Sequence, residues 1–285
     1  MEIEVVAPGI GETALLEIDT NTVFQTIRGL GACFFEGSNE NLFIEMGSSG
    51  LRTGYNSIEP VNDNDDPYVI NMDAINQDAY DWETFRYLQE NGVESVILSY
   101  WWLENWMMEN LVTSTAYPTV YWNWTGNPWN KERNFHIDPL MYEEFAENVI
   151  ATVKLFRKNN INLKGISIQN EPLLVQAYGG NYLDPIHYAE VLKVVGKRLD
   201  LEGMGDVLLF GPEQFTVESS TGFWDGLKSL NDAEIFDHLD VFAVHGYGDD
   251  GIQPGIPSND DWIKYNQRAV EKDKELWMTE NRTGL

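Results

Sequence analysis

Short apolar stretches alternate with longer amphipathic stretches along most of the chain. The apolar stretches are rich in Val, Ile, Leu and Phe, which favours β-strands. They cover residues 26–33, 51–58, 93–101, 163–172, 207–213, 240–248 and 275–280. Because strands that alternate with helices usually form parallel βαβ units, the pattern predicts an α/β protein with a parallel sheet.

The clearest amphipathic stretch begins at Asp138 and Pro139 and ends at Asn159 and Asn160. Its apolar residues recur every three or four positions, as expected for a helix with one buried face. They are Tyr142, Phe145, Val149, Val153 and Phe156. Proline is tolerated in the first turn of a helix, so this stretch predicts one long helix. Shorter helices are predicted in residues 78–92, 184–199 and 223–230, and around Trp262 and Tyr265.

The chain length of 285 residues fits one (β/α)8 TIM barrel, a fold of about 250 residues. We expect residues 22–285 to form this barrel, incomplete at the C-terminus, because the pattern contains seven β/α units and lacks the eighth. Residues 1–21 form an N-terminal extension that could supply a strand of a side domain.

Two irregular stretches interrupt the pattern. Residues 101–135 predict a long insertion, and its six tryptophans argue against disorder. An ordered loop of that length is usually functional. Residues 63–66 read Asp-Asn-Asp-Asp and could bind a cation, although a solvated loop is the simpler interpretation.

The charge balance is strongly acidic. The chain has 46 acidic and 18 basic residues, a formal net charge of −28. Such a surface repels phosphates and anionic lipids, so we expect neither nucleic acid nor a membrane as a partner. The excess charge predicts a well-solvated surface or adaptation to high salt.

Cysteine and histidine usage argues against disulfides and metal centres. The single cysteine, Cys33, cannot form an intramolecular disulfide, and its apolar neighbours predict a small buried residue. The four histidines show no metal-binding spacing, so we expect no zinc site and no cofactor. The N-terminus lacks the basic and apolar regions of a signal peptide.

Glutamates end two of the predicted strands, Glu171 the fourth and Glu280 the seventh. Active sites of TIM barrels lie at these carboxyl ends. A solvent contact is the simpler interpretation of either residue alone, but the two together favour a catalytic pair. One carboxyl group can protonate a glycosidic oxygen while the other attacks the anomeric carbon, and in retaining enzymes the two lie about 5–5.5 Å apart.

Five segments together resemble glycoside hydrolase family 30, whose members are retaining (β/α)8-barrel glycosidases. The resemblance covers residues 22–280. ISIQNEP at 166–172 resembles the acid/base motif, and LWMTE at 276–280 resembles the nucleophile strand. FQTIRGLGACFFEG at 24–37 resembles the opening segment, and SYWWLENWMMEN at 99–110 resembles the third-strand segment. The stretch at 138–172 is similar to the helix and strand that precede the acid/base.

The resemblance implies a role for each matching residue. Glu171 would be the acid/base and Glu280 the nucleophile. Asn170 would bind the sugar 2-hydroxyl, Arg52 would keep Glu280 ionised, and the hydroxyl of Tyr247 would contact Glu280.

Further residues would line the same cleft. His245 lies two residues before Tyr247 and should face the same side of its strand. Trp101, Trp102 and Trp106 would stack on sugar rings, although each could equally be a core residue. Family 30 also has a β-sandwich side domain and an aromatic residue at the end of the eighth strand, and neither is found in this sequence.

The sequence therefore predicts a monomeric, cofactor-independent retaining β-glycosidase whose partner is a carbohydrate substrate. The bond could be of xylan, glucan or galactan type, cleaved in endo or exo mode. The alternative is a non-catalytic glycan-binding barrel or an inactive fragment of such an enzyme. The resemblance favours an extracellular location.

Overall fold

The computed structural model describes residues 2–6, 13–17, 27–35, 38–101, 103–108, 137–174, 181–247 and 260–281. The chain divides into two units, Met1–Leu30 and Gly31–Leu285. In the first unit, β1 (Glu2–Val6) and β2 (Thr13–Glu17) form an antiparallel hairpin, where the sequence indicated one strand. That residues 1–21 belong to a side domain stays a prediction.

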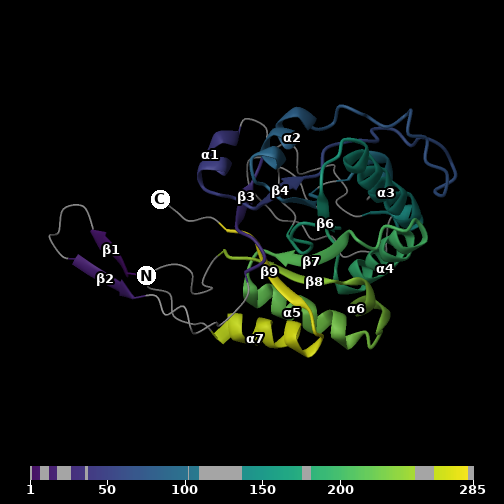
Figure 1. The fold of residues 1–285 in the computed structure, drawn as a ribbon. Helices are drawn as coiled ribbons and strands as arrows, with labels where there is room; N and C mark the ends of the chain where they lie inside the picture. The colour runs from purple at the N-terminus through teal and green to yellow at the C-terminus, as the bar shows by residue number, and fades with distance from the viewer. Residues whose placement is uncertain are drawn as a thin grey trace, which may run out of the picture. The chain divides into compact units, whose positions relative to one another are not determined.

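The second unit contains one parallel sheet, and its spatial order follows the order of the sequence (Figure 1). The seven described strands are β3 (Gly31–Cys33), β4 (Gly50–Gly54), β5 (Ser95–Ser99), β6 (Leu163–Ser167), β7 (Leu208–Gln214), β8 (Val241–His245) and β9 (Glu275–Glu280). All neighbouring pairs are parallel. The predicted parallel sheet is therefore confirmed, and it fits a (β/α) barrel of which seven strands are described.

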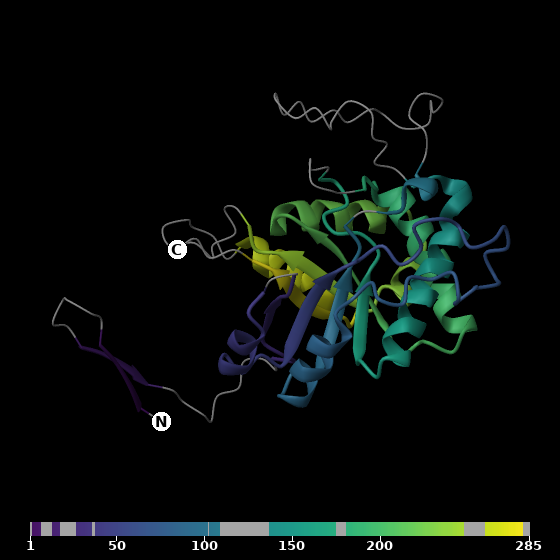
Figure 2. The ribbon, with the colours of Figure 1, turned by 90° about the horizontal axis from the view of Figure 1, so that it is seen from above.

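Helices lie around the outside of this sheet (Figure 2). They are α1 (Glu40–Glu45), α2 (Trp82–Glu90), α3 (Tyr142–Lys158), α4 (Pro185–Leu201), α5 (Val217–Ser229), α6 (Glu234–His238) and α7 (Asp260–Glu271), with short 3-10 turns η1 (Asn105–Met107) and η3 (Pro139–Met141). The sequence pattern did not indicate α1 and α6, because helices of five or six residues are too short to show a period.

Helix α3 is buried on more sides than its apolar pattern predicts. Pro139 occupies the first turn, and Asp138 caps it by accepting a hydrogen bond from the Leu140 amide (2.9 Å). The polar residue Asn148 is 1% exposed. The loop of residues 55–81 covers this polar side of the helix, and the Asn148 side chain donates to Glu59 Oε2 (3.0 Å).

Aromatic packing joins α2 to α3. Phe156 of α3 is fully buried, and its ring contacts Tyr80, Trp82 and Phe85 at centroid distances of 5.1, 5.2 and 6.0 Å. A buried side chain of this size stabilises the fold by about 1.5–3 kcal/mol. This cluster fixes the outer layer against which β5 and β6 are held.

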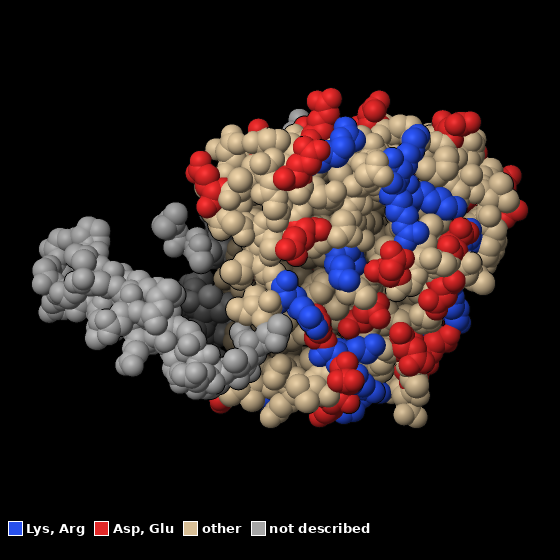
Figure 3. Space-filling view, viewed as in Figure 1, with Lys and Arg blue, Asp and Glu red and all other residues tan. Residues whose placement is uncertain are grey.

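Acidic and basic side chains lie beside one another on the face shown in Figure 3. Lys193 pairs with Asp232 at 2.6 Å, and Arg268 binds Asp225 through two hydrogen bonds of 3.0 and 2.9 Å. Among the described residues, no helix combines the length and apolar character that crossing a membrane requires.

Candidate active site

The carboxyl ends of the central strands carry an unusual backbone. Glu171, which follows β6, has φ of 47°, and Glu213, near the end of β7, has φ of 50°. The left-handed conformation costs a non-glycine residue about 1–2 kcal/mol. The Glu171 amide donates to the Glu213 carbonyl (3.1 Å), and the Asn170 amide donates to the Tyr100 carbonyl (2.7 Å). These bonds hold the backbone at Glu171 and Asn170 against neighbouring strands at the carboxyl end of the sheet.

Arg52 of β4 organises the site. Its guanidinium is 3% exposed and donates from Nη1 to Glu280 Oε2 (2.7 Å), from Nη2 to Asn170 Oδ1 (2.7 Å) and from Nε to Glu213 Oε1 (3.2 Å). Burial alone would lower the pKa of Arg52, but the charge of Glu213, Cys33 and Glu280 raises the pKa above its usual range. A planar guanidinium with five donors can hold three partners at once, so Arg52 fixes them relative to one another.

Glu213 is the carboxylate that the sequence interpretation missed. Its side chain is fully buried and accepts a hydrogen bond from Ser99 Oγ (2.8 Å). Burial would raise the pKa of Glu213, but the charge of Arg52 and the nearby His245 ring outweigh it, and the pKa falls to about 2. Glu213 is therefore a permanent buried negative charge that balances Arg52.

Glu280, the last residue of β9, receives a donor at each carboxylate oxygen. Tyr247 donates its hydroxyl to Oε1 (2.5 Å), while Arg52 donates to Oε2 (2.7 Å). Burial, and then the contact with Glu280, raises the pKa of Tyr247, so its hydroxyl keeps its proton. The ring of Phe215 stacks on Tyr247 with centroids 4.7 Å apart.

Glu171 lies in a different setting. It is 4% exposed, and His245 Nδ1 lies 2.9 Å from its Oε1. His245 Nε2 points the other way, 3.6 Å from Glu213 Oε1 and 3.9 Å from Glu280 Oε2. Burial would lower the pKa of His245, but its hydrogen bond to Glu171 and the nearby Glu213 carboxylate raise the pKa above the ordinary value. The imidazole of His245 thus lies between the three carboxylates.

The three predicted tryptophans differ in position. Trp101 is half-buried, with its ring 5.5 Å from that of Phe35 and 5.8 Å from the Arg52 guanidinium carbon. Trp106 instead donates from Nε1 to the carbonyl oxygen of Glu59 (2.9 Å) and packs against the core. Trp102 lies outside the described residues. Of the two described tryptophans, Trp101 is therefore the one that lies beside Arg52.

The structure brings six other predicted residues together: Arg52, Asn170, Glu171, His245, Tyr247 and Glu280. The sequence interpretation missed Glu213, Ser99 and Phe215. Glu213 ends an apolar strand just as Glu280 does, so the same rule could have found it. Cys33, expected to be buried, is half-buried, with Sγ 3.7 Å from Arg52 Nη1, and burial raises the pKa of its thiol.

Comparison with known proteins identifies solved structures that share the fold of this chain. No family model matches the chain, and no curated protein matches it. Solved structures do: the glycoside hydrolase family 30 subfamily 8 xylanase of Clostridium acetobutylicum is 21% identical with a TM-score of 0.64 over 92% of this chain. An endo-β-1,6-glucanase is 16% identical with a TM-score of 0.66 over 92%. The family 30 endoxylanase of Clostridium papyrosolvens is 22% identical with a TM-score of 0.58 over 90%.

The chain spans 57%, 58% and 56% of the lengths of these three proteins. Identities this low are informative about the fold and not about the substrate. The described part of the chain therefore has the fold of the family 30 glycoside hydrolases.

Proposed function

We propose that this protein is a retaining β-glycosidase in which Glu280 is the nucleophile and Glu171 the acid/base. The observation that carries the proposal is that two strand-end glutamates share one site but have different partners. Glu280 is held by a guanidinium and a phenol hydroxyl, whereas Glu171 faces His245. Carboxyl groups in contrasting environments can divide the roles of acid and nucleophile.

Glu280 is the better nucleophile of the two. Both of its oxygens accept hydrogen bonds from donors that are themselves fixed, so the carboxylate is oriented before substrate arrives. In the first step, one oxygen of Glu280 would form a bond to the anomeric carbon while the bond from that carbon to the leaving oxygen breaks. The result is a covalent glycosyl ester on Glu280.

Glu171 would move the proton in both steps. It donates a proton to the leaving oxygen in the first step, and then takes a proton from the water that attacks the ester. The second step releases the sugar with its original configuration and restores both carboxyl groups. Asn170 supports this assignment, because its Oδ1 accepts from Arg52 and leaves the Nδ2 donors for the sugar 2-hydroxyl.

The comparisons and Trp101 indicate which substrates to test first. Two of the similar structures are xylanases and one is a β-1,6-glucanase, so xylan and β-1,6-glucan are the first substrates to test. Trp101 and Phe35 form an aromatic pair near Arg52, and aromatic rings can pack against the C–H face of a sugar.

Reducing-sugar release from xylan, β-1,6-glucan, β-galactan and β-mannan, at low and high salt, tests the proposal. The parent would be compared with Glu171→Gln and Glu280→Gln. Glu275→Gln is the matched control, because Glu275 lies at the opposite end of the same strand as Glu280. We expect both site variants to lose at least about 1,000-fold in activity, and the control to retain it.

An aryl glycoside with a good leaving group separates the two roles. It needs no proton donor in the first step, so Glu171→Gln should still show a burst of released phenol, whereas Glu280→Gln should show none. The anomer first seen by NMR should match that of the substrate. Inversion would refute the retaining mechanism, and glycan binding by a folded parent without any release would favour the non-catalytic alternative.

A further inference from the structure

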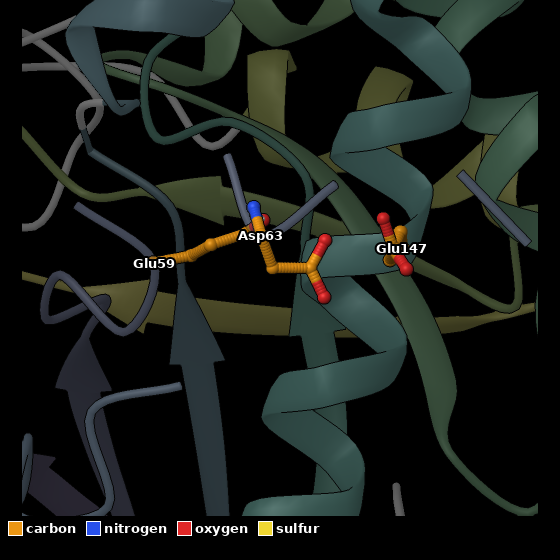
Figure 4. Close-up of side chains that lie close together, drawn as sticks. All are labelled: Glu59, Asp63 and Glu147. Atoms are coloured by element: carbon orange, nitrogen blue, oxygen red, sulfur yellow. The ribbon is translucent and has the colours of Figure 1, made fainter. Parts of the chain in front are cut away.

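A second group of carboxylates lies away from Arg52 and contains Glu59, Asp63 and Glu147. Glu59 and Asp63 belong to the loop of residues 55–81, which follows β4, and Glu147 belongs to α3. One carboxylate oxygen from each residue lies within 4.8 Å of the other two. Figure 4 shows the side chains from the loop extending toward the helix that carries Glu147.

Glu147 is a buried carboxylate that lacks a hydrogen-bond donor among the described residues. It is 1% exposed, and neither of its carboxylate oxygens has a hydrogen-bond partner in the described part of the chain. Its neighbour Glu144, 8% exposed, is a further carboxyl group and can form a hydrogen bond with Glu147 only when one of the two carries a proton. A buried carboxylate without a donor or a counter-charge is strongly unfavourable.

The surrounding charges add to this cost. Burial, and then the charges of Asp63 and Glu59, raises the pKa of Glu147 to about 8. Burial also raises the pKa of Glu59 to about 7, in spite of the hydrogen bond that it accepts from Asn148. Three carboxylates this close together, one of them buried without a hydrogen-bond donor from the described residues, form a site that a cation would stabilise.

We propose that Glu59, Asp63 and Glu147 bind a divalent cation, with Ca²⁺ as the preferred ion. All three residues offer oxygen, the ligand atom that hard cations prefer. Ca²⁺ accepts about six to eight oxygens at about 2.3–2.6 Å in flexible geometry, which suits carboxylates from two different elements, whereas Mg²⁺ requires strict octahedral geometry at about 2.0–2.1 Å. Asp63 is half-buried, so water can complete the coordination from its side.

The bound cation would tie the loop to α3 and fix Trp106. The Glu59 carbonyl accepts the hydrogen bond from Trp106 Nε1, and Glu59 Oε2 accepts from Asn148, which also donates to Tyr55 Oη (3.2 Å). A cation held by Glu59 would therefore order the segment on which this tryptophan rests. This role is independent of the proposed glycosidase activity.

Calorimetric titration of the metal-free chain with CaCl2 and MgCl2 tests the site, in about 0.5 M KCl to screen weak binding to the acidic surface. The variants are Glu147→Gln and Asp63→Asn. Asp66→Asn is the matched control, because Asp66 belongs to the same acidic run but is exposed and outside the group. Tb³⁺ emission excited through tryptophan gives a local readout, since Trp106 contacts Glu59.

We expect one equivalent of Ca²⁺ to bind the parent and the control, with at least tenfold weaker binding in the two site variants. Ca²⁺ at a hundredfold excess over Kd should raise the parent Tm by about 5–10 °C relative to EDTA. In EDTA at pH 8, Glu147→Gln should be at least as stable as the parent, which shows that it folds. Equal Tm values of the parent in Ca²⁺ and EDTA, or unchanged Ca²⁺ affinity in Glu147→Gln, would overturn the proposal and leave shared protons as the means of stabilising the group.

Discussion

Replacing Glu213 with Gln removes the buried negative charge that balances Arg52 while keeping the shape of the side chain. Glu213 is fully buried, and its contacts with Arg52, Ser99 and His245 involve both carboxylate oxygens. Its pKa falls from 4.5 to about 2 in the folded protein. At about 1.36 kcal/mol for each tenfold change in proton affinity, ionised Glu213 contributes about 3 kcal/mol to stability.

The stabilisation by Glu213 depends on pH, and this dependence distinguishes it from other effects of the substitution. Because the folded pKa of Glu213 is lower than the unfolded value, its contribution is fully present above about pH 4.5 and is lost as the pH falls toward 2. The difference in unfolding free energy between the parent and Glu213→Gln should therefore be about 3 kcal/mol at pH 7 and shrink as the pH falls below 4.5. The corresponding loss in Tm at pH 7 is about 6–12 °C.

Urea unfolding followed by tryptophan fluorescence at a series of pH values measures this difference. Glu271→Gln is the matched control, because Glu271 forms an exposed pair with Lys228 at 3.3 Å and should contribute less than about 1 kcal/mol. A Glu213→Gln variant as stable at pH 7 as Glu271→Gln would refute the reasoning. So would a difference that stays constant down to pH 2.5.

Three further changes test other parts of the structure. Tyr247→Phe removes a donor to Glu280, so kcat should fall by about 10–100-fold with little change in Tm, and an unchanged kcat would contradict this role. Glu280→Gln should speed alkylation of Cys33 by iodoacetamide, because the Glu280 charge raises the pKa of that thiol; mass spectrometry measures the rate, and an equal rate in the parent would contradict it. Gly196→Ala within α4 should destabilise the protein by about 1–3 kcal/mol, although alanine favours helices, because the new Cβ would lie 2.4 Å from the His238 ring. Thermal melts measure this effect, and a more stable Gly196→Ala variant would show that His238 moves aside.

The sequence predicted the parts of this protein that depend on local pattern. Each strand of the parallel sheet was visible as an apolar run, and β9 begins and ends where the pattern placed it. Glu171 and Glu280 were found because a carboxylate at the end of an apolar strand is a local feature. Glu213 has the same feature, since it ends the predicted strand of residues 207–213, but the sequence interpretation assigned it no role because only the fourth and seventh strands carried a recognised motif.

Long-range contacts could not be predicted in the same way. Glu147 and Asn148 occupy the polar positions of a periodic helix, which usually face water. Their burial depends on the loop of residues 55–81, and no feature of α3 itself indicates that Glu59 and Asp63 will lie over it. For the same reason, the sequence left residues 63–66 as either a solvated loop or a cation-binding loop and gave no sign that Asp63 would lie near Glu147.

The left-handed backbone at Glu171 lowers the stability of the fold at a residue that the proposed reaction needs. Asn adopts φ near 47° far more readily than Glu does, so Glu171→Asn would release part of about 1–2 kcal/mol of strain. A mutant library selected for heat resistance alone would therefore enrich Asn at this position and discard the proposed proton donor. Directed evolution of this protein should screen hydrolysis in every round, because the residue that makes the turn unfavourable is the one on which the proposed chemistry depends.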